Sequence, residues 1–152
     1  MSVTITEERP DRPDVAPLVE ELEAHLASLY PAESRHGFSV QKLIDQGVVF
    51  YVIRVDGEPA GCGGVKLFGT EFGELKRMYV RPPFRGRGFG KLLIDTLTAH
   101  AARRGIKTMR LETGIYQEDA IRLYEREGFR RIEPFANYKY DPVSLCFEKN
   151  LE

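Results

Sequence analysis

A chain of 152 residues is the length of one ordinary domain, residues 1–152, and no second domain is needed to account for it. Its 22 lysines and arginines balance 23 aspartates and glutamates, so the net charge of −1 gives no support for a nucleic-acid or membrane partner held by bulk electrostatics. Two cysteines are too few for a disulfide framework, and the lack of a signal-peptide pattern or a ~20-residue apolar run favours a soluble, cytoplasmic protein.

The first third of the chain predicts a short strand followed by two helices. Residues 3–6 alternate in type, and after two prolines either Asp11 or Asp14 is expected to cap a helix. Leucines then recur at helical spacing as far as Tyr30. Residues 31–38 indicate a loop, and Ser39 is expected to cap a short second helix. Two histidines in this part, His25 and His36, have no spacing that suggests a metal site, and we expect them at the surface or the edge of the core.

A hairpin and a further strand follow. Residues 48–55 are rich in β-branched and aromatic types, and Asp56-Gly57 is a strong signal for a two-residue turn into a second strand over 60–68. Glycines 61, 63 and 64 weaken that strand and mark either a bulge or a close approach of another backbone or a ligand.

The central stretch, residues 74–95, combines a strand, a glycine-rich loop and a helix start. Residues 74–80 alternate like a strand, and glycines stand at 86, 88 and 90 before the helical spacing begins. Backbone N–H groups without Cβ obstruction, next to the positive end of a helix dipole, are suited to hold phosphate. Arginines at 77, 81, 85 and 87 add local positive charge.

The remaining elements complete an α/β pattern. The helix after the loop is expected to end at Gly105, and a strand over 108–113 makes a βαβ unit with parallel neighbouring strands, which puts the glycine loop at the carboxyl end of a strand. A further helix runs from Glu118 to Gly128, and strands are predicted near 131–135 and 144–148, joined by an aromatic loop.

Two known phosphate-binding fingerprints fail on this loop. The dinucleotide pattern Gly-x-Gly-x-x-Gly requires glycine where Lys91 or Leu93 stands, and the Walker loop requires glycine at Arg85. The pattern that fits is Arg-x-x-Gly-x-Gly over 85–90, with a second match downstream at 120–129, Ala-Ile-Arg-Leu-Tyr-Glu-Arg-Glu-Gly-Phe. These motifs resemble the GNAT superfamily of acyl-CoA N-acetyltransferases. The resemblance implies an α/β fold, α+β by some schemes, with a mixed, mostly antiparallel central sheet, one parallel, splayed strand pair and flanking helices.

The resemblance also implies that acetyl-CoA is the co-substrate and that no metal is required. Its pantetheine arm would pair with backbone groups near Met78, Tyr79 and Val80. Its pyrophosphate would be held by the loop Arg85, Gly86, Arg87, Gly88, Phe89 and Gly90. Family members often have an asparagine just before the last motif helix, where this chain has Gln117, so the equivalent CoA contact is a weaker expectation.

Two residues are candidates for acid–base chemistry. A lysine-like amine has a pKa of about 10.4 and must lose a proton before it attacks a thioester. Glu74 resembles the catalytic glutamate of some family members, against the alternative of a solvated acid at a strand edge, and Glu71 and Glu112 are further candidates for the base. Tyr124 matches the family's tyrosine that protonates the leaving sulfur, against the alternative of a core aromatic residue. A backbone N–H on the splayed strand, near Met78 or Tyr79, would stabilise the oxyanion.

The acceptor is expected to be a small-molecule amine. A protein lysine or N-terminus is a competing acceptor, and a non-catalytic acyl-CoA sensor is an alternative of another class. Glu33, Tyr138 and Tyr140 are candidates to attract and cover a cationic amine, against the alternative of packing and solvated surface. The resemblance is compatible with a homodimer.

Overall fold

The computed structural model describes residues 1–35 and 38–152, so the expectation for His36 falls outside the described residues, whereas His25 is exposed. One seven-stranded sheet has the order β1-β2-β3-β4-β5-β7-β6. The strands are β1 (Val3–Glu7), β2 (Val49–Val55), β3 (Glu58–Phe68), β4 (Phe72–Val80), β5 (Thr108–Gly114), β6 (Arg130–Ile132) and β7 (Ser144–Asn150). The helices are α1 (Ala16–Leu29), α2 (Val40–Asp45), α3 (Phe89–Arg103) and α4 (Glu118–Arg126). The β4–β5 pair is parallel, and the other neighbours are antiparallel.

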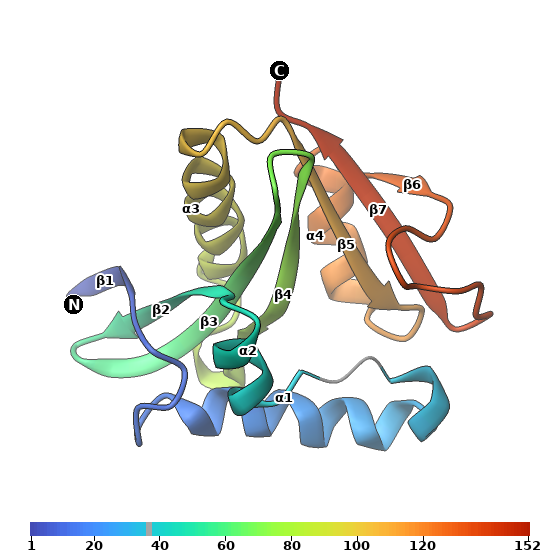
Figure 1. Ribbon diagram of the computed structural model, residues 1–152. Coiled ribbons are helices and arrows are strands. Elements are labelled where there is room, and N and C mark those ends of the chain that lie inside the picture. Colours follow the sequence, from blue (N-terminus) through green and yellow to red (C-terminus); the bar gives the residue numbers. More distant parts are fainter. Residues whose placement is uncertain (36–37) are drawn as a thin grey trace.

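The parallel pair opens into a V. The ladder between β4 and β5 covers Gly73 and Glu74, paired with Met109 and Arg110, and the strands then diverge. Figure 1 shows β4 and β5 meeting at one end and separating toward α1, which runs across the open end. The backbone groups of β4 beyond Glu74 on the β5 side are thereby left open for a ligand. The sequence prediction of a mostly antiparallel sheet with one splayed parallel pair is confirmed.

Helices cover both faces of the sheet, and the side chains of β2 point alternately into the two cores that result. Phe50 and Val52 pack against α1 and α2, whereas Ile53 and Val55 pack against the start of α3. The larger core joins α3 and α4 to β5 and β7 around Met109. The predicted two-residue hairpin is confirmed, since Asp56 and Gly57 have φ of 50° and 85° between β2 and β3.

A bulge interrupts β4 just beyond Glu74. Cys62 pairs with Tyr79 and Gly64 with Lys76, so Gly63 alone opposes Arg77 and Met78. Arg77 has a φ of 52°, and a Cβ on Gly63 would lie 2.5 Å from the sulfur of Met78. A Cβ on Gly61 would also lie 2.9 Å from the carbonyl oxygen of Tyr79, so the predicted close approach of another backbone is confirmed, whereas the extra residue of the bulge lies opposite the glycine run, in β4. Five consecutive residues of β4, Glu74–Met78, line one cavity, and the last two of them form the bulge.

The helix caps differ from expectation at one place. Ser39 caps α2 by accepting a hydrogen bond from the Lys42 N–H at 3.1 Å, as predicted. The predicted cap of α1 by Asp11 or Asp14 is wrong, because Val15 occupies the N-cap position. Asp14 binds the guanidinium of Arg54 at 2.7 Å, and Asp11 pairs with Arg9.

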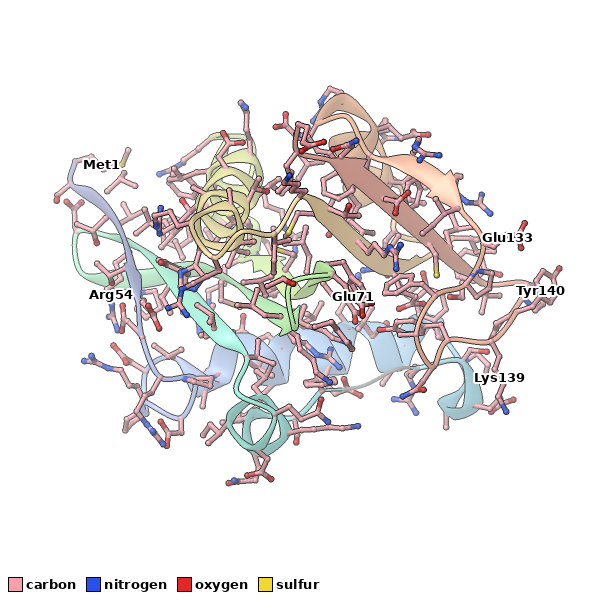
Figure 2. All side chains as sticks on the ribbon, turned by 45° about the horizontal axis from the view of Figure 1, so that its top comes forward. Met1, Arg54, Glu71, Glu133, Lys139 and Tyr140 are labelled. Carbon is pink, nitrogen blue, oxygen red and sulfur yellow. The ribbon has the colours of Figure 1, made fainter. Side chains whose placement is uncertain are left out.

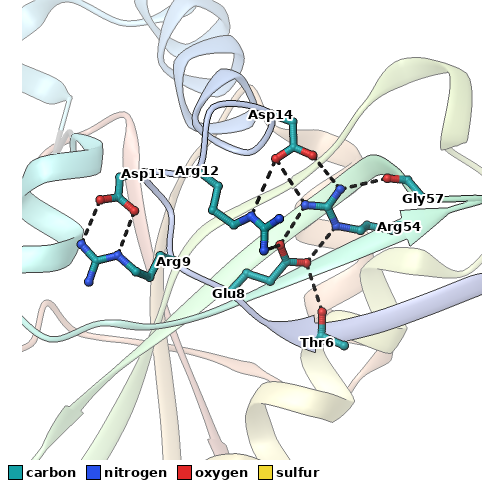
Figure 3. Close-up of polar contacts among 8 residues, drawn as sticks. All are labelled: Thr6, Glu8, Arg9, Asp11, Arg12, Asp14, Arg54 and Gly57. Carbon is teal, nitrogen blue, oxygen red and sulfur yellow. Dashed lines mark hydrogen bonds and ion pairs between the residues drawn. The ribbon is translucent and has the colours of Figure 1, made fainter.

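Arg54 anchors the segment before α1 to the β2–β3 hairpin. Its guanidinium contacts the carboxylates of Glu8 and Asp14 and the carbonyl of Gly57 (Figure 3). Figure 2 places Arg54 and Met1 at the opposite end of the molecule from Tyr140. The hydrogen bond from Arg54 lowers the pKa of the Glu8 carboxyl, although partial burial opposes this. The network is therefore a pH-dependent contribution to stability, remote from the splayed strands.

Replacing Arg54 with glutamine is expected to lower the free energy of unfolding at pH 7 by about 1–2 kcal/mol, since Glu8 loses its closer charged partner, at 2.8 Å, and keeps only Arg12 at 3.5 Å. When the pKa of a carboxyl is lower in the folded than in the unfolded protein, the group stabilises the fold at pH values above its unfolded-state pKa. This stabilisation is lost as the pH falls through the folded-state pKa. Urea unfolding at pH 7 and pH 3 should show the wild-type advantage shrinking in acid. Arg9→Gln, whose pair with Asp11 is exposed, is the control and should change stability little. An advantage equal at both pH values would contradict this account.

Within residues 1–35 and 38–152, no helix combines the length and apolar character needed to cross a bilayer.

Candidate active site

A cavity of about 100 Å³ lies where β4 and β5 part. Its walls come from α1 and the segment after it, from the bulged part of β4, from the end of β5, and from α4 and the aromatic loop before β7. Its lining residues are Leu22, Leu26, Tyr30, Ser34, Arg35, Phe38, Glu74, Leu75, Lys76, Arg77, Met78, Leu111, Glu112, Thr113, Gly114, Gln117, Tyr124 and Tyr138. Both candidate catalytic residues, Glu74 and Tyr124, are among them.

Glu74 is held by one of its two carboxylate oxygens. Its Oε2 accepts a hydrogen bond from the Tyr138 hydroxyl at 2.5 Å and lies 2.9 Å from Nζ of Lys76. Only 2% of the residue is exposed, so it is not the solvated strand-edge acid of the alternative interpretation. Among the described residues, no hydrogen bond is made to Oε1. The carboxylate is thus oriented through one oxygen while the other remains available to the cavity.

Lys76 lies against Tyr138, one of the three residues that the sequence analysis expected to attract and cover a cationic amine. Its Nζ lies 4.4 Å from the ring centre of Phe38 and 5.4 Å from that of Tyr138, and it donates to the Tyr138 hydroxyl at 3.0 Å. Burial lowers the pKa of Lys76 and the Glu74 carboxylate opposes that shift, while burial followed by the Glu74 charge raises the pKa of Tyr138. Tyr140 is 83% exposed at the outer edge of the molecule (Figure 2), and Glu33 is also exposed; neither lines the cavity.

Tyr124 is both a core residue and a cavity residue. It is 6% exposed, and its ring packs edge-on against Phe129 with centroids 5.9 Å apart. Burial raises the pKa of Tyr124, and the Glu112 carboxylate adds to the shift. The phenol therefore keeps its proton at neutral pH and can donate it.

The two other candidate bases are placed very differently. Glu71 lies exposed in the turn before β4 and does not line the cavity. Glu112 lines the cavity from β5, where its Oε2 accepts a hydrogen bond from the Ser144 hydroxyl at 2.6 Å. Geometry thus leaves Glu112 as the alternative to Glu74.

The glycine loop lies beyond the end of β4 and leads directly into α3. Gly86 and Gly88 have φ of 79° and 81°, a conformation that side-chain-bearing residues rarely adopt. Gly88 is the N-cap of α3, and in the described structure no side chain caps that helix. The N–H groups of the first turn therefore have neither an intrahelical acceptor nor, among the described residues, a side-chain cap.

Three of the predicted cofactor residues direct their side chains to other parts of the protein. The side chain of Phe89 is buried in the core beside β2, Tyr79 donates to Glu21 of α1 at 3.3 Å, and Val80 packs against the same core as Phe89. Arg85 donates from Nε to the Val80 carbonyl at 2.8 Å and so fixes the loop to the strand end.

Two of the four arginines around the loop form ion pairs with α1. Arg77 and Arg81, expected near the phosphates, instead pair with Glu23 and Glu21 of α1 at 3.1 Å and 2.7 Å. Arg87 is exposed on the loop itself. Gln117 lines the cavity just before α4, and its Oε1 accepts from the Gly114 N–H at 3.1 Å.

Gly88→Ala is expected to weaken CoA binding about tenfold, because an alanine forced to positive φ costs about 1–2 kcal/mol and the loop would shift to relieve that strain. Gly69 provides a matched control, since its φ is 58° and no atom crowds its Cβ position, but it lies in the turn after β3. Calorimetric titration with CoA should show the loss only for Gly88→Ala, while unfolding shows similar destabilisation of both variants. Equal CoA affinity in the two variants would remove the loop from the binding site.

The resemblance to the GNAT superfamily implies that the first helix and its loop, residues 29–38, flank the acceptor cleft, and side chains of this segment do line the cavity. The sequence did not indicate which of its side chains, or which cations, form the wall. Leu22, Leu26 and Tyr30 lie four residues apart on one helix face, a spacing that predicted core packing but gave no sign of a cavity. The Tyr30 hydroxyl accepts from the N–H of Tyr116 at 2.9 Å and joins the end of α1 to the end of β5. Arg35 enters the cavity from the segment after α1, and no motif marks it.

The described residues, 1–35 and 38–152, contain no group of three or more His, Cys, Asp or Glu side chains that could hold a metal ion.

Comparison with known proteins agrees with this geometry. The model of the acetyltransferase (GNAT) family matches residues 16–129. The chain is 41% identical to an IAA acetyltransferase of Azospirillum brasilense over 99% of both chains. It superposes with a TM-score of 0.84 on a structure from Klebsiella pneumoniae assigned to the acyl-CoA N-acyltransferases, at 37% identity over 99% of this chain and 98% of that one.

A more distant structure shows the fold with its cofactor. An N-acetyltransferase of Thermoplasma acidophilum in complex with coenzyme A aligns over 99% of both chains with a TM-score of 0.77, and at 21% identity this likeness is one of fold.

The open mixed sheet with one splayed parallel pair and the glycine loop at the strand end, together with these matches, define an acyl-CoA-dependent transferase. This chain belongs to the GNAT family and is an acetyl-CoA-dependent N-acetyltransferase.

Proposed function

We propose that this protein transfers the acetyl group of acetyl-CoA directly to a primary amine of a small molecule, with Glu74 as the base and Tyr124 as the acid. The observation that carries the proposal is that both side chains line one cavity at the point where β4 and β5 part. A cavity of about 100 Å³ has room for an acetyl group and a small acceptor, which favours a free small molecule over a protein segment.

In the proposed reaction, Glu74 removes a proton from the bound ammonium through its Oε1, because Oε2 is held by Tyr138 and Lys76. The neutral nitrogen then attacks the thioester carbonyl carbon, and an N–H of the open β4 edge near Met78 stabilises the resulting oxyanion. As the C–S bond breaks, Tyr124 gives its proton to the leaving sulfur. The nitrogen loses its second proton as the tetrahedral adduct collapses, and this proton restores the Tyr124 phenol, while the proton held by Glu74 passes to solvent. The products are the N-acetylated amine, CoA thiol and one proton.

The rest of the co-substrate follows the strand. We propose that the pantetheine arm pairs with the β4 edge from Met78 to Val80 and that the pyrophosphate binds the N–H groups of Arg85–Gly90. Support comes from the open edge of β4, the uncapped start of α3 and the positive-φ glycines between them.

An amine panel monitored by release of free thiol tests the proposal, combined with calorimetry of CoA, acetyl-CoA, ATP and NAD. We expect CoA and acetyl-CoA to bind and one class of small amines to release CoA thiol. Thiol release with peptides but not with small amines would assign the acceptor to proteins. Binding of CoA without release from any amine would contradict the proposed reaction.

A further inference from the structure

The three cations of the cavity are not equally neutralised. Lys76 pairs with Glu74 at 2.9 Å, and Arg77 pairs with Glu23 at 3.1 Å. Arg35 is left with the same Glu23 carboxylate at 3.8 Å, which is too long for a hydrogen bond. One positive charge of the cavity wall therefore lacks a close counterion among the described residues.

Arg35 is also short of hydrogen-bond acceptors. Its side chain is 27% exposed, and its Nε is buried without a partner in the described part of the chain. A guanidinium carries five N–H donors in a planar fork that matches a carboxylate or phosphonate. Leaving this buried Nε–H unpaired costs free energy unless a ligand supplies the acceptor.

Arg35 and Glu74 belong to different walls of the cavity. Arg35 comes from the segment after α1, whereas Glu74 projects from β4, and both line the same space. The lining of this space also includes the apolar side chains of Leu22, Leu26 and Leu111. This arrangement suits a molecule with an ammonium group at one end, an oxyanion at the other and an apolar body.

We propose that the acceptor is an amine that also carries an oxyanion, either a carboxylate or a phosphonate, and that Arg35 binds this group and so determines acceptor specificity. The inference rests on the proposed amine acetylation and adds the chemical class of the acceptor. The ammonium end lies toward Glu74 Oε1, where proton removal takes place, and the oxyanion lies against the Arg35 guanidinium.

The test compares amines that share a body and differ in the end group. Suitable sets are leucine with leucinol, and β-alanine with 3-aminopropan-1-ol and 1,3-diaminopropane, while 2-aminoethylphosphonate distinguishes the two oxyanions. We expect kcat/KM of the wild-type enzyme to be about 10- to 100-fold higher for an amine whose other end group is an oxyanion than for the matching amine whose other end group is a hydroxyl or a second amine. Arg35→Gln should remove most of this preference by raising KM for the anionic amine, leaving the neutral amines and acetyl-CoA unaffected.

Two further variants sharpen the result. Arg35→Lys keeps the charge but loses the planar fork, so it should retain only part of the preference. Arg9→Gln removes an exposed arginine remote from the cavity and should behave as wild type. Neutral amines acetylated as well as anionic ones, or an equal loss on both classes in Arg35→Gln, would overturn the inference.

A binding measurement separates this inference from the proposed reaction. Saturation-transfer NMR with 4-methylpentanoate, which is leucine without its amine, and with propylphosphonate should detect binding of at least one of them to the wild-type enzyme in the presence of CoA. That binding should be lost in Arg35→Gln. If no amine is acetylated, the proposed reaction fails, yet Arg35-dependent binding still supports an oxyanion site. Absence of binding, or equal binding to both proteins, overturns the inference.

Discussion

Glu74→Gln is expected to lower kcat at pH 7 by about 100-fold or more, within the range usual for loss of a general base. Glutamine keeps the shape of the side chain and can still contact Tyr138 and Lys76, but it cannot take a proton from the acceptor ammonium. The defect should shrink as pH rises toward about 10.4, where a lysine-like amine loses its proton to water. Stopped assays of thiol release between pH 6 and pH 10 measure this.

The controls for Glu74 come from the two other candidate acids. Glu71→Gln alters an exposed carboxylate outside the cavity and should leave the rate unchanged, whereas Glu112→Gln tests the other acid of the cavity. Calorimetry should show nearly the same acetyl-CoA affinity in Glu74→Gln as in the wild type, which separates lost chemistry from lost binding. A variant with the wild-type pH–rate profile would exclude Glu74 as the base and direct attention to Glu112.

Local rules predicted much of this fold because they act over short stretches of chain. Asp56-Gly57 specifies its turn through two left-handed residues, and Gly105 ends α3 with a φ of 83°. The crossover from β4 through α3 to β5 follows from strand and helix lengths. The same locality explains the wrong cap: Asp14 suits an N-cap, but the Arg54 guanidinium, 40 residues away in the chain, supplies a charged partner.

The site depended on contacts that no local pattern carries. Tyr138 and Glu74 are 64 residues apart in the chain, and their hydrogen bond exists because the loop before β7 folds over the bulged part of β4. In a regular strand, alternate side chains point to opposite faces, so Lys76 and Arg77 would not be expected to line one cavity. The bulge at Arg77 breaks this alternation, and a positive φ at an arginine is not predictable from sequence. The family resemblance indicated Glu74 and Tyr124, but it suggested Tyr138 only as a cover for the acceptor amine and not as the residue that orients Glu74.

Tyr124→Phe is expected to lower kcat about 100-fold while changing the KM for acetyl-CoA little, because the phenol's proton is needed only as the C–S bond breaks. Phenylalanine keeps the ring packing against Phe129, so the free energy of unfolding should change by less than about 1 kcal/mol. Since burial raises the pKa of Tyr124, wild-type kcat should not fall through the usual tyrosine range of about 10.

Tyr140→Phe removes a hydroxyl from an 83% exposed tyrosine and is the matched control for this variant. Steady-state thiol release with saturating amine gives kcat, and urea unfolding gives the free energy of unfolding, for Tyr124→Phe and for Tyr140→Phe. If Tyr124 served only as a core aromatic, its phenylalanine variant would match Tyr140→Phe in rate as well as in stability. A rate loss confined to Tyr124→Phe, with stability retained, assigns the hydroxyl to the departure of the sulfur rather than to the packing of α4.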